Sequence, residues 1–100
     1  MTEKVLEAKF VRDVRALGGV TYKFVSPGNV GVPDRIVITP EGRVWFVELK
    51  TETGKLSKMQ RYQLNRLRAQ NCNVVVLYGV AEVENTVRAI FQNARGGDAG

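Results

Sequence analysis

The chain has 100 residues, with 15 Lys and Arg against 10 Asp and Glu, which gives a formal net charge of +5. A chain of this length forms one domain around a single core. It has no histidine and one cysteine, which excludes Ser-His-Asp chemistry, histidine-dependent hydrolysis, thiolate zinc sites and internal disulfides. Any catalysis would therefore depend on carboxylates, lysine and hard metal ions.

The first half of the chain predicts one helix followed by three strands. Apolar residues recur at helical spacing over residues 3–17, which predicts an amphipathic helix that two glycines end. Residues 20–25 alternate loosely and are typical of a strand, and a loop rich in glycine and proline follows them. Residues 34–39 and 43–50 are predicted to be the two strands of a hairpin, joined by a turn at residues 40–42.

The second half predicts a helix, a strand and a helix. The helix over residues 57–70 begins with an S-x-x-Q capping box. Residues 74–78 form a continuous apolar run, which is typical of a buried strand covered on both faces. A final helix is predicted over residues 80–93.

These elements define a single predicted domain. Their order, α-β-β-β-α-β-α, indicates an α/β fold in which helices flank a mixed sheet. We expect this domain to span residues 1–93. The glycine-rich residues 94–100 are expected to form a flexible tail.

The predicted hairpin brings two carboxylates together. If the turn is centred near Glu41, residues whose numbers sum to 82 face each other, and Asp34 lies opposite Glu48. Directly opposed Cβ atoms are roughly 5 Å apart, and two carboxylates that close repel each other unless a cation lies between them. Strand alternation puts Lys50 on the same face as Glu48. The alternative, a surface ion pair at a strand end, does not explain the Pro-Asp across the hairpin.

Two further polar side chains are predicted to point inward. Glu7 shares a helix side with apolar residues three, four and seven positions later, which suggests that it faces a positive group; the alternative is an exposed glutamate favoured by the helix dipole. Gln60 shares a face with leucines four and seven positions later, so it should lean toward the sheet, unless it serves the capping box alone. Arg35 alternates to the opposite face from Asp34, and we expect no catalytic role for it.

The distribution of charge indicates a polyanionic partner rather than a membrane. Residues 50–70 hold six Lys and Arg against one Glu, and such a basic patch suits a polyanion. No apolar run approaches the roughly 20 residues of a membrane span, and the N-terminus lacks the apolar stretch of a signal peptide, so we expect a cytosolic protein. One helix face in this segment carries a polar stripe of Lys58, Arg61, Asn65 and Arg68. The stripe either contacts phosphates or is a solvated face.

These motifs, taken in order, resemble the VRR-NUC domain, the virus-type replication-repair nuclease branch of the PD-(D/E)xK superfamily. The resemblance covers roughly residues 5–78 and is closest to the stand-alone phage and bacterial type. It rests on Glu7, Lys23, Ser26-Pro27-Gly28, Gly31-Val32-Pro33-Asp34-Arg35, Val47-Glu48-Leu49-Lys50-Thr51, Gly54-Lys55-Leu56-Ser57 and Gln60.

The resemblance implies a restriction-endonuclease-like fold and a metal-dependent DNA endonuclease. Its expected substrate is structured DNA, with an action similar to that of Holliday-junction resolvases on four-way junctions. Small viral members of this family work as homodimers, and in a virus-infected cell the protein would act in the host cytosol. The alternatives are a nucleic-acid-binding module that keeps the fold without cleavage, and an adaptor whose basic helix docks an acidic partner.

The resemblance also assigns roles to residues. We expect Mg²⁺ or Mn²⁺ to be held by Asp34, Glu48, the main-chain carbonyl of Leu49 and Glu7. Lys50 would orient or deprotonate the attacking water, and Gln60 would position the lysine or the water. The DNA-binding residues are expected to be Lys23, Lys55, Lys58, Arg61 and Arg68. The apolar residues of the loop between the first two strands form the candidate dimer surface, namely Val25, Val30 and Val32.

Overall fold

Seven elements follow one another in the predicted order. The helices are α1 (Glu3–Ala16), α2 (Lys58–Ala69) and α3 (Gly79–Ala99), and the strands are β1 (Val20–Lys23), β2 (Arg35–Ile38), β3 (Val44–Lys50) and β4 (Asn73–Tyr78). This computed structural model describes residues 1–99, with the side chains of residues 1–92. The backbone of α3 continues past the predicted end at residue 93. The tail predicted over residues 94–100 lies outside the residues with described side chains, and it stays a prediction.

The strands form one mixed sheet in the order β1-β2-β3-β4. The pairs β1–β2 and β2–β3 are antiparallel, and β3–β4 is parallel. The prediction of a mixed sheet is therefore confirmed, and β3 lies between β2 and β4 within it. β4 is an edge strand that packs against α2 and α3. Its side chains are mostly half-buried, because the outer edge has no neighbouring strand.

The predicted hairpin register is also confirmed. Arg35 pairs with Val47 and Ile38 pairs with Val44, so the numbers of paired residues sum to 82. Gly42 lies in the connecting turn with a φ of +85°, a backbone conformation that glycine adopts without strain. The next position along this register places Asp34, which directly precedes β2, beside Glu48 of β3.

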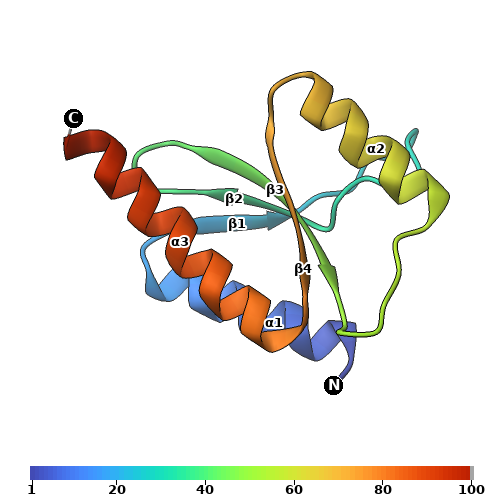
Figure 1. Ribbon diagram of the computed structural model, residues 1–100, viewed down its shortest axis with the longest axis horizontal. Coiled ribbons are helices and arrows are strands. Elements are labelled where there is room, and N and C mark those ends of the chain that lie inside the picture. The colour runs from blue at the N-terminus through green and yellow to red at the C-terminus, as the bar shows by residue number, and fades with distance from the viewer. Residues whose placement is uncertain (100) are drawn as a thin grey trace.

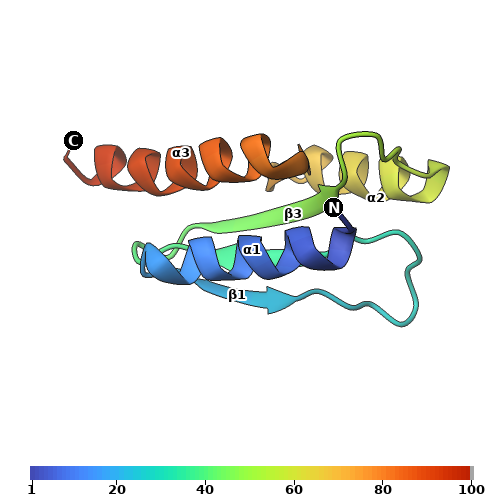
Figure 2. The same cartoon turned by 90° about the horizontal axis from the view of Figure 1, so that it is seen from below.

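The helices lie on both faces of the sheet. Figure 1 shows α1 and α3 side by side on one face, with α2 on the other. Figure 2, turned by 90°, shows α1 running along the sheet on the same face as α3. None of the helices within residues 1–99 is long and apolar enough to cross a membrane.

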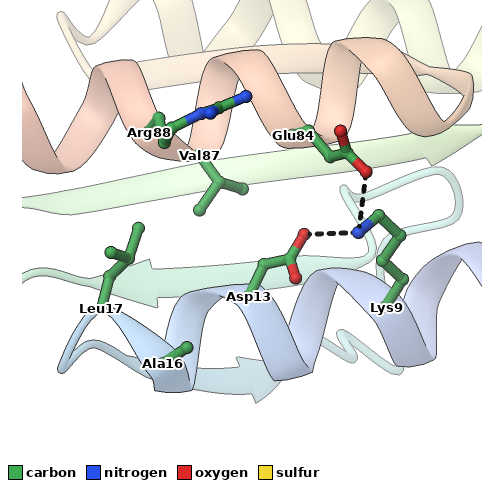
Figure 3. Close-up of a pocket in the computed structure, with 7 residues that line it drawn as sticks. All are labelled: Lys9, Asp13, Ala16, Leu17, Glu84, Val87 and Arg88. Carbon is green, nitrogen blue, oxygen red and sulfur yellow. Dashed lines mark ion pairs between the residues drawn. The ribbon is translucent and has the colours of Figure 1, made fainter.

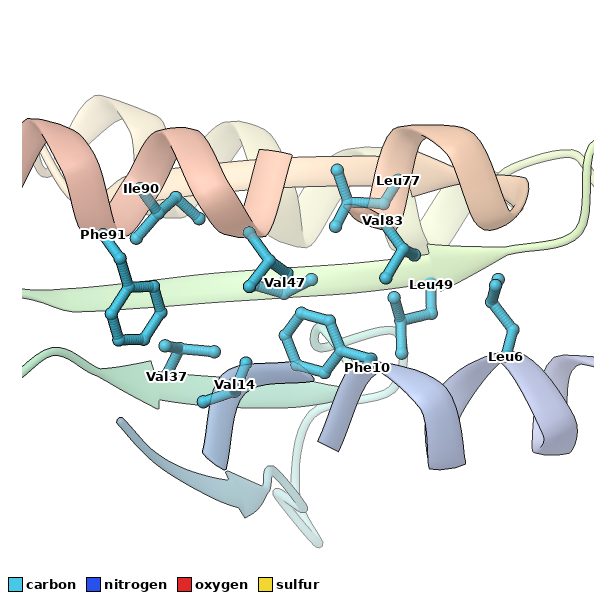
Figure 4. Packing of buried hydrophobic residues seen from close by; sticks show 11 residues of the cluster. Leu6, Phe10, Val14, Val37, Val47, Leu49, Leu77, Val83, Ile90 and Phe91 are labelled. Carbon is cyan, nitrogen blue, oxygen red and sulfur yellow. The ribbon is translucent and has the colours of Figure 1, made fainter. Parts of the chain in front are cut away.

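The hydrophobic core fills the space between the sheet and the α1–α3 pair. Leu6, Phe10 and Val14 of α1 are fully buried, because they lie on one side of the helix. They pack against Val47 and Leu49 of β3 and against apolar residues of β2, β4 and α3 (Figure 4). Truncating a residue as large as Phe10 to alanine typically destabilises a protein by about 3–5 kcal/mol. The core therefore fixes α1 against the odd-numbered residues of β3.

A small groove separates α1 from α3 on the outside of this core. Lys9 of α1 lies 3.1 Å from Asp13 in the same helix and 3.1 Å from Glu84 in α3 (Figure 3). The groove has a volume of about 310 Å³. Ion pairs as accessible as these contribute little to stability, so the two helices are held together mainly by the core beneath them.

The loop between β1 and β2 packs tightly against the start of α2. Gly31 has a φ of +92°, and a Cβ atom there would lie 2.6 Å from the carbonyl carbon of Met59. Only glycine fits this close approach of two backbones. The backbone N–H of Phe24 donates to the carbonyl of Asp34 at 2.9 Å, which continues the β1–β2 pairing. The loop thus delivers Asp34 to the end of the sheet that lies next to the first turn of α2.

Candidate active site

Asp34 is held at the end of the hairpin by the backbone of β3. Pro33 before it is buried, and Asp34 itself is half-buried. The Oδ2 atom of Asp34 accepts a hydrogen bond from the backbone N–H of Leu49 at 2.9 Å. This contact fixes one carboxylate oxygen of Asp34 beside Glu48, which directly precedes Leu49 in β3.

Glu48 is a carboxyl group enclosed by protein. Its exposed fraction is 1%, so it is as buried as the surrounding core residues. Its Oε2 atom accepts a hydrogen bond from Nε2 of Gln60 at 3.1 Å and lies 3.9 Å from Nζ of Lys50. Its Oε1 atom is the buried side-chain oxygen or nitrogen that lacks a hydrogen-bond partner in the described part of the chain. An unpaired buried carboxylate oxygen is energetically unfavourable, so this atom marks a place where a positive group fits.

The surroundings of Glu48 favour its protonated form. Burial is the largest cause, and the nearby charge of Asp34 is the second; together they raise the pKa of Glu48 to about 8, while Lys50 acts in the opposite direction. Glu3 in the first turn of α1 contributes a weaker raising effect. Near neutral pH Glu48 therefore holds a proton, and a divalent cation could take the place of that proton.

Gln60 has two functions at once. Its Oε1 atom accepts from the backbone N–H of Ser57 at 2.8 Å, and the Ser57 side chain accepts from the backbone N–H of Gln60 at 3.1 Å. This is the predicted capping box, and it is confirmed. The other end of the same amide donates to Glu48. The two interpretations of Gln60 from sequence are therefore compatible, and the cap of α2 is tied to the buried carboxyl.

Glu7 pairs with Arg35. Its Oε2 atom lies 3.1 Å from Nη1 of Arg35, whose Nε atom lies 3.3 Å from Oγ1 of Thr21. Arg35 pairs with Val47 in the sheet, and its side chain lies on the face that α1 covers. Glu7 thus does face a positive group, as its position on α1 indicated. The group was missed from sequence, although a carboxylate on an apolar helix side was itself a signal for a buried cation.

Two carboxyl groups therefore lie together at this site, those of Asp34 and Glu48. Among the described side chains of residues 1–92, no three Asp, Glu, Cys or His residues come together in an arrangement that could hold a metal ion. Asp34 and Glu48 supply two hard oxygen donors and one unpaired oxygen, which fits a cation that keeps most of its waters. The assignment of Glu7 as a further metal ligand stays a prediction.

The predicted DNA-binding residues lie on the surface. Lys23 ends β1, Lys55 lies in the loop after β3, and both are exposed. The α2 polar stripe, defined as Lys58, Arg61, Asn65 and Arg68, is also exposed along its length. It lies on the same helix as Gln60, whose side chain is bonded to Glu48.

Comparisons with known proteins find similar sequences and a similar fold. The VRR-NUC domain matches residues 5–81. "Putative nuclease p44" of Acyrthosiphon pisum secondary endosymbiont phage 1 is 45% identical over 75 residues, which are 75% of this chain and 81% of the phage protein. A solved VRR-NUC domain superimposes with a TM-score of 0.81 at 32% identity, covering 86% of this chain and 94% of that one. Another VRR-NUC domain protein, 14% identical with a TM-score of 0.70 over 88% and 86% of the two chains, shares the fold.

The fold, the family match and the similar phage nuclease together identify an α/β nuclease domain. The chain belongs to the VRR-NUC domain family, because the family pattern covers most of its length and the similar phage protein covers three quarters of it. The family assignment made from the motifs is confirmed, and so is the fold class.

Proposed function

We propose that this nuclease is a Mg²⁺- or Mn²⁺-dependent DNA endonuclease that hydrolyses phosphodiester bonds in branched DNA. The observation that supports it most directly is the buried Glu48, which has an unpaired oxygen, a pKa of about 8 and a neighbouring Asp34. A carboxyl group in this state destabilises the protein unless it binds a proton or a cation. Its place next to Lys50, at the end of the sheet, suits phosphate chemistry.

Each residue of the site has a role in this proposal. Asp34, Glu48 and the main-chain carbonyl of Leu49 would hold the ion, which when bound supplies positive charge to the scissile phosphate. Lys50 offsets further phosphate charge and orients the attacking water. Gln60 holds the Oε2 atom of Glu48 in place through its 3.1 Å hydrogen bond, so the carboxyl keeps its orientation when the proton leaves.

The proposed substrate is a four-way junction or a similar branched DNA, and the proposed active species is a homodimer. Two-fold symmetric cutting of a junction needs two matched active sites, which a two-fold dimer supplies. The loop between β1 and β2 is apolar and accessible near the site, with Val25 67% exposed and Val30 73% exposed. Exposed apolar groups of this kind are typical of contact surfaces.

The test is a cleavage assay on labelled four-way junction, flap, fork, linear duplex and single-stranded DNA with Mg²⁺ or Mn²⁺. Asp34→Asn and Glu48→Gln are expected to abolish cleavage, whereas Glu41→Gln in the hairpin turn should cut like the wild type. Glu41 is a matched control because it is an exposed carboxylate at the opposite end of the same hairpin. Near-normal cleavage by either site variant would overturn the assignment.

The homodimer is tested separately by sedimentation at micromolar concentration, with and without junction DNA. A dimeric mass supports the proposal. A monomeric mass in both conditions, combined with full junction cleavage, would rule the dimer out while leaving the nuclease assignment intact.

A further inference from the structure

A second cavity lies between α2 and the loop that follows β1. Its volume is about 340 Å³, which is within the range of small-ligand sites. Its walls are both apolar and polar, and they include Phe24, Asn29, Val32, Gln63, Arg66 and Gln70. We call it the α2 groove. The aromatic ring of Phe24 is fixed from behind by Phe46, with ring centroids 5.6 Å apart.

Gln63 is the unusual residue of this groove. Its exposed fraction is 8%, which is low for an amide side chain. None of the side-chain hydrogen bonds in the described part of the chain involves it. In that part, the side-chain oxygen or nitrogen that lacks both a hydrogen-bond partner and contact with solvent belongs to Glu48. Because Gln63 also lacks a side-chain hydrogen bond, its amide must still contact the open space of the groove. An amide that water reaches in a groove can exchange that water for the acceptor and the donor of a ligand.

The chemistry of the groove suits a nucleobase. Its lining has three amide side chains, one arginine and no carboxylate, so nothing in it repels a polyanion. Amides match the donor and acceptor edges of bases, and an aromatic ring offers a stacking surface. Arg66, which lines the groove, has its guanidinium carbon 5.6 Å from the ring centroid of Tyr62, and Tyr62 is 51% exposed. Exposed aromatic and arginine pairs of this kind are typical of sites where unpaired bases stack.

The position of the groove connects it to the reaction. Gln63 follows Gln60 by three residues, so the two lie about one turn apart on the sheet-facing side of α2. Gln60 is bonded to Glu48. The α2 polar stripe runs along a neighbouring face of the same helix and could hold the phosphates of the same strand. A base in the groove would therefore be held by the same helix that contacts Glu48 through Gln60.

We propose that the α2 groove binds an unstacked nucleobase of the DNA strand, so that the enzyme recognises an unpaired nucleotide next to the cleavage position. The inference rests on the proposed function in taking DNA as the substrate. It goes further in assigning a base-binding site, with Gln63 as the residue that hydrogen-bonds the base and Tyr62 with Arg66 as the stacking surface. None of these three residues belongs to the set of Asp34, Glu48 and Lys50.

The test measures binding without cleavage. In EDTA, fluorescence anisotropy compares a blunt duplex with the same duplex carrying a short single-stranded extension. The wild type is expected to prefer the extended duplex by about tenfold, a modest effect for one stacked base. Gln63→Leu and Tyr62→Ala should reduce that preference by about fivefold and leave the affinity for the blunt duplex unchanged. Gln92→Leu is the matched control, because Gln92 is an exposed glutamine on α3, away from the groove.

A second measurement keeps the proposal falsifiable if Gln63→Leu fails to fold, as judged by circular dichroism. 2-Aminopurine placed in the extension should change its fluorescence when the wild type binds, and Tyr62→Ala, a surface change, should diminish that response. Equal affinity of the wild type for the two duplexes, or an unchanged preference in folded Gln63→Leu, would overturn the proposal. A wild-type dimer that Gln63→Leu turns into a monomer would also overturn it, because a second copy would then occupy the groove. Binding is measured in EDTA, where no cleavage takes place. A failure of the separate cleavage assay would therefore count against the proposed function alone.

Discussion

The state of Glu48 leads to a prediction about stability that needs no DNA. The pKa of Glu48 is raised from 4.5 to about 8, chiefly by burial and then by the charge of Asp34. In the unfolded chain the same carboxyl loses its proton near its ordinary pKa. Between pH 4.5 and 8 the folded state therefore holds a proton that the unfolded state has released. The metal-free protein is thus expected to be most stable below pH 4.5 with respect to this group, and to lose stability up to pH 8.

The size of the effect follows from the shift. A difference of 8 − 4.5, or 3.5 units, corresponds to roughly 5 kcal/mol at 1.36 kcal/mol per unit. The group is 1% exposed, so solvent does not screen it appreciably. This is the upper bound, since relaxation around a buried charge lowers the effective penalty. It is comparable to the whole stability of a small domain.

Glu48→Gln isolates this contribution, because glutamine has nearly the same shape and does not titrate. Urea unfolding in EDTA at pH 5, 7 and 9 is expected to show similar stabilities at pH 5 and a variant more stable by a few kcal/mol at pH 9. Saturating Mg²⁺ at pH 8 should restore the stability of the wild type and leave that of the variant unchanged. A ligand at 100 times its Kd stabilises the folded state by about 2.7 kcal/mol. If the difference in unfolding free energy between the variant and the wild type were the same at all three pH values, the reasoning would be refuted.

Three other changes test the remaining parts of the structure. Lys50→Ala should keep DNA affinity and lose cleavage while Lys55→Ala cuts normally in the same assay; the reverse result would show that the motif lysine is misassigned. Replacing the three basic residues of the α2 polar stripe should reduce the slope of log affinity against log salt by an amount equivalent to up to about three phosphate contacts. An unchanged slope would identify the stripe as solvated surface. Gly31→Ala should lower the free energy of unfolding by at least about 1–3 kcal/mol, because its φ is positive and its Cβ would meet the Met59 backbone at 2.6 Å. Gly28→Ala, with no atom within 4 Å of its Cβ, is the control, and equal losses would contradict this account.

The hairpin and its two carboxylates could be predicted because the forces that set them are local. A short turn fixes the register, and the period of two along a strand then fixes which side chains share a face. Once Arg35 faces Val47, the position of Asp34 beside Glu48 follows from chain continuity. The capping box of α2 is equally local, since it needs only Ser57 and Gln60.

The contacts between distant elements could not be predicted in the same way. The pairing of Glu7 with Arg35 depends on how α1 is rotated on the sheet, which the whole core decides. The bond from Gln60 to Glu48 depends on the docking of α2, which the close packing of Gly31 against Met59 helps to set. The burial of Gln63 has the same origin. Sequence spacing indicates which side of a helix faces inward, but it does not indicate which atom that side will meet.

The division of charges between the two faces of the sheet explains how this domain tolerates a buried carboxyl group that lacks a partner. On the α1 face, Arg35 is neutralised by Glu7 and bonded to Thr21, so its burial is compensated within the protein. On the α2 face, Glu48 has Gln60 and a distant Lys50, and one oxygen remains unpaired. A large apolar core beneath α1 and α3 offsets the destabilisation that results. The uncompensated group therefore lies where a cation and a phosphate can supply the missing partner, whereas Arg35 already has its partners within the protein.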